Sequence, residues 1–228
     1  MRDFYKELEG LNGFFGFDPM MVQQGSREWF RMRSGVITAS KAECILAKKG
    51  TAKRDGYMAE LVAQIATGML PDEVSAKALQ WGKDNEQAAQ DAYSAATFEL
   101  VSTIPFIYKD ESKRFGCSPD GLCATHGLEL KSPWSTRTYI EFICADKVKP
   151  EYVKQCQYSM WVSDLDRWDF ANFDPRMIRN KLHYVSIERD EKMMSQFDDL
   201  GAEFISDMDK MLNKLGLNYG SQFNQVEI

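Results

Sequence analysis

The chain has 228 residues, of which 44% are hydrophobic and 27% charged, so it can bury a substantial core and is too apolar for global disorder. Its net charge of −6 argues mildly against a protein that coats nucleic acid, but it does not exclude an enzyme with a local basic groove. No run of eighteen apolar residues and no basic-then-apolar amino terminus occurs, so we expect a soluble, cytoplasmic protein without a membrane partner.

The cysteines do not form a recognisable framework. The five are scattered and odd in number, and no Cys-x-x-Cys pair occurs, which disfavours a disulfide scaffold and a structural zinc site. The sequence also contains no internal repeat and no Pro/Gly-rich linker. We therefore expect residues 1–228 to form a single domain.

Helices are predicted in the first part of the chain. Thr38 or Ser40 is a suitable N-cap for a helix that extends to about Ala47. Residues 55–67 follow the helical period, and Gly68 is a typical C-terminal signal.

A basic stretch begins in the first of these helices and ends just before the second. Its residues are Lys41, Lys48, Lys49, Lys53 and Arg54. It is the best candidate for a surface that contacts phosphates, although an ordinary solvated loop explains the charges equally well.

A longer helix is predicted from Ser75 to about Ala96. The residues on its inward face are Leu79, Gly82, Glu86, Ala89 and Tyr93. A carboxylate on an inward face is disfavoured unless it is paired or binds a metal. Glu86 is therefore a candidate site residue, and a salt bridge is the alternative.

The remaining chain alternates strands and helices. Short strands are predicted within 98–108 and 114–131, a helix over 151–162, and strands over 168–173 and 182–187. A closing helix is predicted over 191–215. Its expected core residues are Met194, Phe197, Phe204, Met208, Met211 and Leu215. This order predicts an α/β fold with a central mixed sheet flanked by helices.

The most informative segment runs from Gly116 to Pro133. Asp120 lies in a Pro-containing turn, and Glu129 and Lys131 lie two apart on an apolar strand. Residues two apart in a strand point to the same face, and a short hairpin can return Asp120 beside Glu129. Two carboxylates near an ammonium can hold a divalent cation and orient a water, as phosphodiester cleavage requires.

Further roles around this constellation remain open from the residues alone. A chance Glu-x-Lys ion pair is the simplest alternative for Glu129 and Lys131. The backbone carbonyl of Leu130 is a possible oxygen ligand, and Lys131 could orient or deprotonate the water. Gln155 could hold the lysine or the water, or it could be an ordinary surface amide.

The Asp…Glu-x-Lys arrangement resembles the PD-(D/E)xK nuclease superfamily. Six blocks in order along the chain resemble the lambda-type alkaline exonucleases of phages, and they span most of its length. The blocks are residues 34–40, 76–83, 117–123, 128–131, 157–162 and 174–177.

The resemblance implies a restriction-endonuclease-like core and a reaction. The reaction is Mg²⁺-dependent 5′-to-3′ digestion of one strand of linear duplex DNA to mononucleotides, which leaves 3′ overhangs, with Mn²⁺ as a substitute metal. It also implies a homotrimeric ring around DNA, a single-strand annealing protein as partner, and a phage or prophage gene expressed in a bacterial cytoplasm.

The resemblance also implies roles for individual residues. Those assigned to metal binding are Asp120, Glu129, Asp110 and the Leu130 carbonyl. Lys131 is implied as the catalytic lysine, completed by Glu86 and Gln155. The residues expected to hold the 5′-phosphate and the DNA are Arg33, Ser40, Ser118, Thr38 and Leu79, with Leu79 as an apolar wedge at the terminal base pair.

Three alternatives to this reading remain. An endonuclease or junction-cleaving enzyme of the same superfamily would use similar residues. A non-catalytic module that binds DNA ends could share the fold. An unrelated soluble domain would leave the six blocks and the position of Glu86 unexplained.

Overall fold

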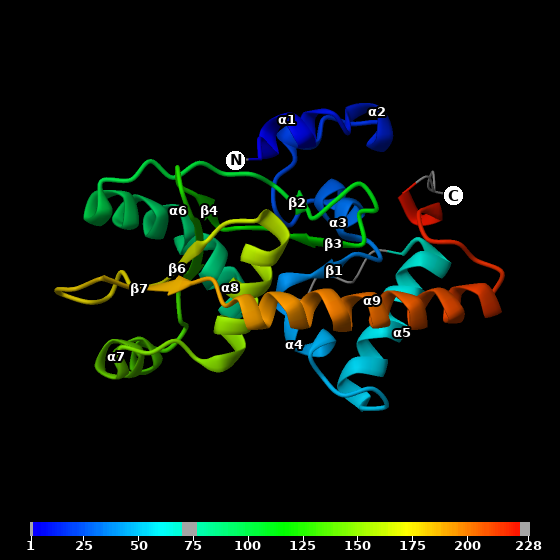
Figure 1. The fold of residues 1–228 in the computed structure, drawn as a ribbon. Coiled ribbons are helices and arrows are strands. Elements are labelled where there is room, and N and C mark those ends of the chain that lie inside the picture. The colour runs from blue at the N-terminus through cyan, green and yellow to red at the C-terminus, as the bar shows by residue number, and fades with distance from the viewer. Residues whose placement is uncertain (1, 70–76, 224–228) are drawn as a thin grey trace.

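The computed structural model describes residues 2–69 and 77–223 (Figure 1). The longer helices are α5 (Ala52–Thr67), α6 (Lys77–Thr97), α7 (Thr136–Ala145), α8 (Pro150–Ser163) and α9 (Glu191–Lys214). The shorter helical segments are α1 (Phe4–Glu9), α2 (Asn12–Phe15), η1 (Pro19–Met21), α3 (Arg27–Arg33), η2 (Ala39–Lys41), α4 (Ala42–Ile45) and η3 (Ser221–Phe223). None of the helices in these ranges is long and apolar enough to cross a membrane.

The strands form two mixed sheets. In the first, β3 (Phe115–Cys117) lies between β1 (Ile37–Thr38), which is parallel to it, and β2 (Ile107–Tyr108), which is antiparallel. The second has the order β4 (Gly121–Leu122), β5 (Gly127–Lys131), β6 (Arg167–Phe173) and β7 (Leu182–Glu188). Only the central β5–β6 pair of this sheet is parallel. The predicted α/β class with mixed sheets between helices is confirmed.

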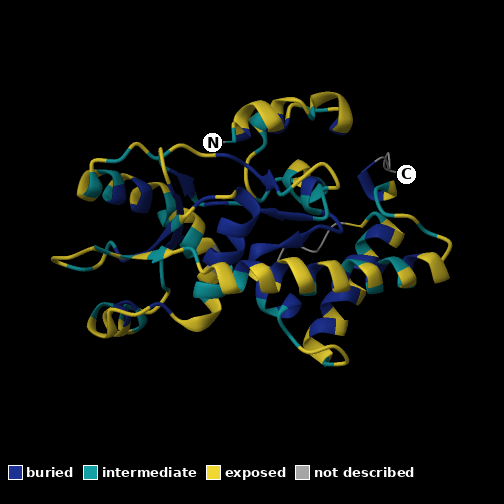
Figure 2. Cartoon of the chain, viewed as in Figure 1, coloured by how far each residue is buried: buried dark blue, intermediate teal, exposed yellow. Residues whose placement is uncertain are grey.

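Helices cover both faces of the central β5–β6 pair. α8 packs on one face, and α6 packs on the other (Figure 1). The α6 face is apolar because Ala89 and Tyr93 of the helix meet Leu128 and Leu130 of β5 in one cluster. Figure 2 shows the buried residues concentrated in the strands and the inner helix faces. The alternation of β5 therefore sends its leucines to α6 and leaves Glu129 and Lys131 on the other side.

Most predicted elements occur, with three differences. The helix predicted from Thr38 or Ser40 is instead β1 followed by the short η2 and α4, and Thr38 makes no side-chain capping bond. α7 was not predicted at all. Leu215 is the C-cap that follows α9 and is 58% exposed, whereas Leu212 within the helix is buried in its place.

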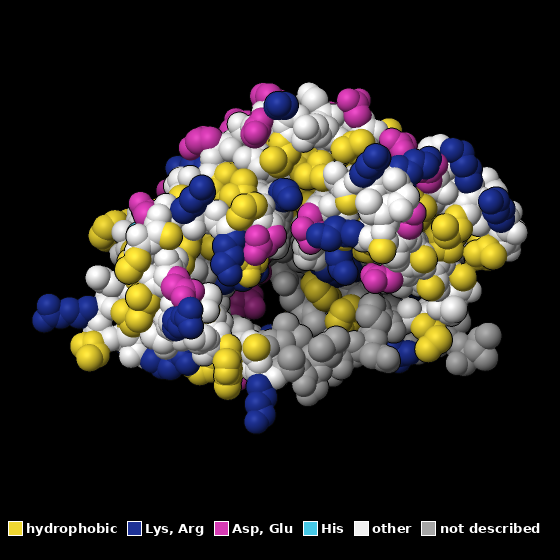
Figure 3. All heavy atoms as spheres, turned by 90° about the horizontal axis from the view of Figure 1, so that it is seen from below, with side chains coloured by type: hydrophobic (Ala, Val, Ile, Leu, Met, Phe, Trp, Pro, Cys, Tyr) yellow, Lys and Arg dark blue, Asp and Glu magenta, His cyan; other side chains and the backbone are white. Residues whose placement is uncertain are grey.

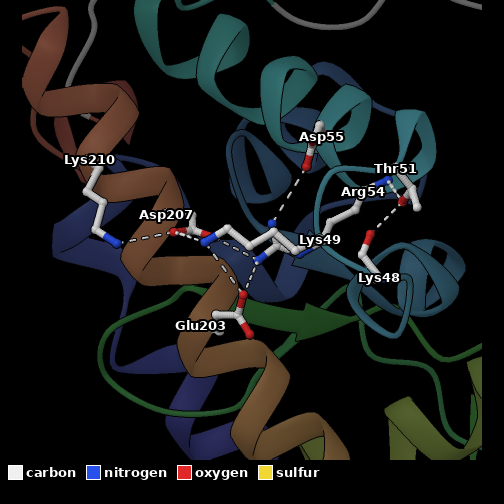
Figure 4. A network of polar contacts seen from close by, with 8 residues as sticks. All are labelled: Lys48, Lys49, Thr51, Arg54, Asp55, Glu203, Asp207 and Lys210. Atoms are coloured by element: carbon white, nitrogen blue, oxygen red, sulfur yellow. Dashed lines mark hydrogen bonds and ion pairs between the residues drawn. The ribbon is translucent and has the colours of Figure 1, made fainter.

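Four of the five residues of the basic stretch, all except Lys48, are paired with acids of the same chain. Arg54 bonds Asp207 at 3.1 Å, and Lys49 reaches the same carboxylate at 2.7 Å (Figure 4). Lys41 and Lys53 pair with Glu60 and Glu43. Figure 3 shows Lys and Arg side chains interspersed with acidic ones on one hollowed face. These pairs favour a structural role for the stretch over a phosphate-contacting one.

Candidate functional site

The turn after β3 brings Asp120 beside β5. The backbone N–H of Asp120 donates to the carbonyl of Leu128 at 3.1 Å, which starts the antiparallel β4–β5 pairing. The Asp120 carboxylate then accepts from the backbone N–H of Leu130 at 2.7 Å. Asp120 is thereby fixed next to Glu129, as the hairpin reading of the sequence predicted.

Glu129 is the centre of a polar cluster between β5 and α8. Its Oε1 accepts a hydrogen bond from the Nζ of Lys131, two residues along the same face of the strand. The same oxygen accepts from Nε2 of Gln155 on α8 at 2.6 Å. The Glu129 side chain is only 3% exposed, so its charge is compensated by these two donors and not by water. The structure thus brings Glu129, Lys131 and Gln155 together.

Helix α6 adds two polar side chains to the same site. Glu86 lies one turn before the buried Ala89 and faces the open end of the site. Gln90 lies one further turn along, and its Nε2 donates to the backbone carbonyl of Asp120 at 2.7 Å. Gln90 was missed from the sequence, although its spacing of four from Glu86 places both on one helix face.

Burial and neighbouring charges shift the pKa values of the ionisable groups at this site. Burial, and then the neighbouring Glu129 carboxylate, raise the pKa of Asp120 to about 8. Burial also raises the pKa of Glu86, an effect that Lys131 opposes and Glu129 reinforces. Burial alone would lower the pKa of Lys131, but Glu129 and Asp120 together raise it. The lysine is thus held as an ammonium among more acids than it can neutralise.

These groups open into a cleft of about 1010 Å³. Glu86, Asp120 and Lys131 lie in its wall. Its aromatic lining residues are Trp29, Phe30, Trp134, Phe142, Tyr152 and Phe170. Lys83, Lys147 and Lys149 also line it, and all three are exposed. A concave, largely apolar space with a few convergent charged groups is typical of a ligand site.

A second polar cluster, called here the Arg33 corner, consists of Arg33, Ser118 and Trp29, and Trp29 also lines the cleft. Arg33 donates to the hydroxyl of Ser118 at 3.0 Å, and its guanidinium lies 3.9 Å from the ring centre of Trp29. Nε1 of Trp29 donates to the same hydroxyl at 3.0 Å and to the Pro105 carbonyl at 3.1 Å. Burial lowers the pKa of Arg33 to about 10, so the group remains a cation at neutral pH. Two predicted residues, Arg33 and Ser118, are therefore in direct contact.

The remaining predicted residues are Asp110, Ser40, Thr38 and Leu79. Asp110 is exposed in the β2–β3 turn, at the opposite end of that hairpin from Asp120, and its carboxylate accepts from the N–H of Ser112 at 2.9 Å. Ser40 is exposed on η2, whereas Thr38 is buried in β1. Leu79 belongs to α6, but its side chain lies outside the described part of the structure.

The donors at the site suit a hard cation. Asp120 and Glu129 would supply carboxylate oxygens, and the backbone carbonyl of Leu130 on β5 is the third oxygen that the resemblance implies. Within residues 2–69 and 77–223, no group of three His, Cys, Asp or Glu side chains could hold a metal ion. Mg²⁺ commonly takes one or two carboxylates and keeps several waters, so two acids and a carbonyl still fit it. The raised pKa of Asp120 fits the same conclusion, because a cation there would relieve the repulsion.

Comparisons with known proteins agree with this geometry. A model of the YqaJ-like viral recombinase domain matches residues 28–166. The structure of an alkaline exonuclease (LHK-Exo) from Laribacter hongkongensis superimposes with a TM-score of 0.73 at 32% identity, covering 84% of this chain and 98% of that one. The same enzyme in complex with dAMP gives 0.72 at 34% identity over the same shares.

Two further relatives match parts of the chain or its fold. ExoD of Escherichia coli (strain K12) is 51% identical over 78 residues, which are 34% of this chain and 90% of ExoD. A phage-related exonuclease from Haemophilus somnus 129PT has a TM-score of 0.60 at 13% identity, covering 79% of this chain and 96% of that one. That last likeness shows the fold alone. The resemblance to phage-type alkaline exonucleases is confirmed, and the chain belongs to the YqaJ-like viral recombinase family.

Proposed function

We propose that this chain is a Mg²⁺-dependent exonuclease that digests one strand of linear double-stranded DNA from its 5′ end. It releases mononucleotides and leaves 3′ single-stranded overhangs for recombination by strand annealing. The observation that carries the proposal is the convergence of Asp120, Glu129 and Lys131 at the wall of one cleft, which Asp120 and Lys131 line while Glu129 is buried behind Lys131. Its support from relatives is the likeness to an alkaline exonuclease over 98% of that enzyme's length.

The residues of the cleft have distinct roles in the proposed reaction. Asp120, Glu129 and the Leu130 carbonyl would hold Mg²⁺, which when bound polarises the phosphate and activates water. Lys131, kept protonated by its acidic neighbours, offsets the charge that develops on the phosphate. Gln155 holds Glu129, and Glu86 completes the acidic wall. Asp110, placed at the other end of its hairpin, has no part in this arrangement.

The Arg33 corner is proposed to bind the terminal 5′-phosphate. The guanidinium is confined between the Trp29 ring and the Ser118 hydroxyl, so it is oriented before the ligand arrives. A planar guanidinium can pair with two phosphate oxygens at once. The hydroxyl of Ser118 donates to the Pro105 carbonyl at 3.0 Å and accepts from Arg33, so its role is to orient the guanidinium. Ser40, exposed on η2 directly after β1, is the remaining candidate for this pocket.

The assembly and the setting belong to the same proposal. A homotrimeric ring that encloses the duplex would keep the enzyme bound between cuts, and a chain of net charge −6 would then need little bulk attraction to DNA. A single-strand annealing protein would receive the 3′ overhang. Residues 1–228 act as one nuclease domain in the cytoplasm of a bacterial host, with Mn²⁺ as a substitute for Mg²⁺.

The proposal is tested with linear and covalently closed circular duplexes of the same sequence. With Mg²⁺, we expect the protein to degrade the linear form and to leave the closed circle intact. In EDTA, both forms should remain intact. Nicking of the circle would instead indicate an endonuclease. Binding to linear ends without cleavage of either form would indicate a non-catalytic end-binding module.

The 5′-phosphate pocket has its own test. We expect linear DNA with 5′-hydroxyl ends to be digested more slowly than the phosphorylated form, and Arg33→Ala to abolish this difference. Ser26→Ala removes the N-cap of the helix that carries Arg33 and serves as a control for mere disturbance of α3. Equal rates on both ends for the unaltered protein would remove the proposed role of Arg33.

A further inference from the structure

We propose that Trp134 is a stacking platform for an unpaired nucleobase of the strand that lies in the cleft. The inference rests on the proposed nuclease function and adds a base-binding subsite beside the bond to be cut. Trp134 follows Lys131 by three residues and lines the same cleft. The subsite would take any of the four bases, because each base presents an aromatic face.

Trp134 is the most open of the aromatic residues that line the cleft. Its relative exposure is 54%, whereas Trp29 lies against Arg33 and Tyr152 stacks on Phe170 at 5.0 Å. A solvent-exposed aromatic ring in a cleft that binds a nucleic-acid strand is available to stack on a base. The exposed lysines of the same cleft, Lys83 and Lys149 among them, complement the phosphates of a nucleic-acid strand.

The Trp134 indole packs against a second tryptophan on α6. Its ring meets the ring of Trp81 on α6 edge to face, with centroids 5.8 Å apart and an interplanar angle of 89°. The guanidinium of Arg176 lies 4.5 Å from the ring centre of Trp81 and donates to the Trp134 carbonyl at 2.9 Å. It donates to the Pro133 carbonyl as well, at 3.0 Å.

Arg176 is itself held by a buried acid. Asp174 is fully buried and accepts two hydrogen bonds of 2.8 Å from the guanidinium. Both residues belong to the Asp-Pro-Arg-Met block, residues 174–177, which follows β6. The proposed chemistry of the cleft does not use this block directly. The block instead ties the end of β6 to the segment after β5. Such an anchored ring can stack on a base at little cost in side-chain entropy.

The experiment compares Trp134→Leu and Trp134→Phe with the unaltered protein. The control is Phe98→Leu, which removes another exposed aromatic ring, 93% exposed and outside the cleft. Each protein binds a fluorescent 5′-phosphorylated oligonucleotide in EDTA, followed by anisotropy. Parallel oligonucleotides carry an abasic analogue at the first or second 5′ nucleotide. KM and kcat for digestion are then measured with Mg²⁺ on duplexes with the same ends.

We expect Trp134→Leu to weaken binding and raise KM by about tenfold on intact ends, the effect of losing one base–aromatic stack. Trp134→Phe should retain most of the affinity, and Phe98→Leu should behave as the unaltered protein. At the abasic position that faces Trp134, the unaltered protein and Trp134→Leu should become equal. This equality is the readout that a purely structural role would not produce.

Two results would overturn the inference. An equal loss on intact and abasic ends would mean that Trp134 acts only through the local structure. Unchanged binding and KM on every oligonucleotide would mean that no base reaches it. Failure of the nuclease proposal looks different: base-dependent binding in EDTA would persist, but no protein would digest DNA with Mg²⁺.

Discussion

Two clusters of acidic and basic side chains in this chain shift the pKa of an aspartate in opposite directions. Around Asp207 on α9, the cations of Lys49, Arg54 and Lys210 meet one carboxylate. Hydrogen bonds from these groups, that of Lys49 first, lower the pKa of Asp207 to about 2. In the cleft, burial and Glu129 raise the pKa of Asp120 to about 8.

The cluster around Asp207 is therefore typical of a structural ion-pair network, and the cluster around Asp120 is typical of a candidate active site. Near Asp207 the charges are matched, and the acid is more stable ionised than it would be in water. Near Asp120, acids outnumber the single lysine, and the protein maintains a repulsion that a bound cation would relieve. Carboxylates in a cleft whose pKa is shifted far from the ordinary value are typical of functional sites.

The largest expected effect is on catalysis. Glu129→Gln or Lys131→Met should lower the rate of linear-duplex digestion by about 10²- to 10⁴-fold, the usual contribution of a positioned acid, base or charge. Asp207→Asn, an equally conservative change in the matched cluster, should leave the rate per folded molecule unaltered. Digestion by either cleft variant at the normal rate would refute the assignment of the site.

The next effect is on stability. Asp207→Ala should lower the free energy of unfolding by about 2 kcal/mol, because it leaves the buried guanidinium of Arg54 with weaker partners. Urea denaturation measures this change. Asp199→Ala, at an exposed position of the same helix, should have little effect. Equal stability of the two variants would mean that the cluster around Asp207 contributes nothing.

A smaller effect concerns pH in the metal-free protein. The folded chain keeps a proton on Asp120 up to about pH 8, whereas an unfolded Asp loses it near pH 3.8. The folded state thus binds more protons between these values, and its stability falls as the pH rises through the window. Unfolding measured in EDTA at pH 5 and pH 9 should show a smaller fall for Asp120→Asn.

Added Mg²⁺ provides the complementary observation. At pH 9 it should restore stability to the unaltered protein, because a cation binds the ionised carboxylate. Asp120→Asn should gain much less from the same concentration. If the free energy of unfolding in EDTA changed with pH in the same way for both proteins, the raised pKa of Asp120 would be contradicted.

The smallest effect is expected in the basic stretch. Lys49→Ala should leave the dependence of DNA binding on salt concentration unchanged, because Lys49 is already paired with Asp207 and contributes no phosphate contact. Lys149→Ala in the cleft is the comparison and should make the salt dependence weaker. A reduced salt dependence for Lys49→Ala would restore the stretch as a DNA surface.

Much of the fold and the centre of the site could be predicted from local patterns. The alternation in β5 and the length of the turn were enough to place Asp120 beside Glu129. The period of α5 and its glycine stop were equally clear. These features depend on residues close together in sequence, so a local pattern contains the information needed.

The missed features depend on distant residues. The acid that neutralises Lys49 and Arg54 lies more than 150 residues away along the chain, so the sequence alone left the role of the basic stretch open. Helix α7, which buries Tyr139 and Phe142, was not predicted. The support of Trp134 by Arg176 joins segments 42 residues apart and has no local signature.

The most direct test uses one linear duplex that carries a 5′-phosphate on a single strand and a different label on each strand. With Mg²⁺, we predict loss of the phosphorylated strand alone, release of mononucleotides from its 5′ end, and survival of its complement. In EDTA both strands should remain intact. Digestion from the 3′ ends, equal loss of both strands, or no digestion would contradict the proposed function.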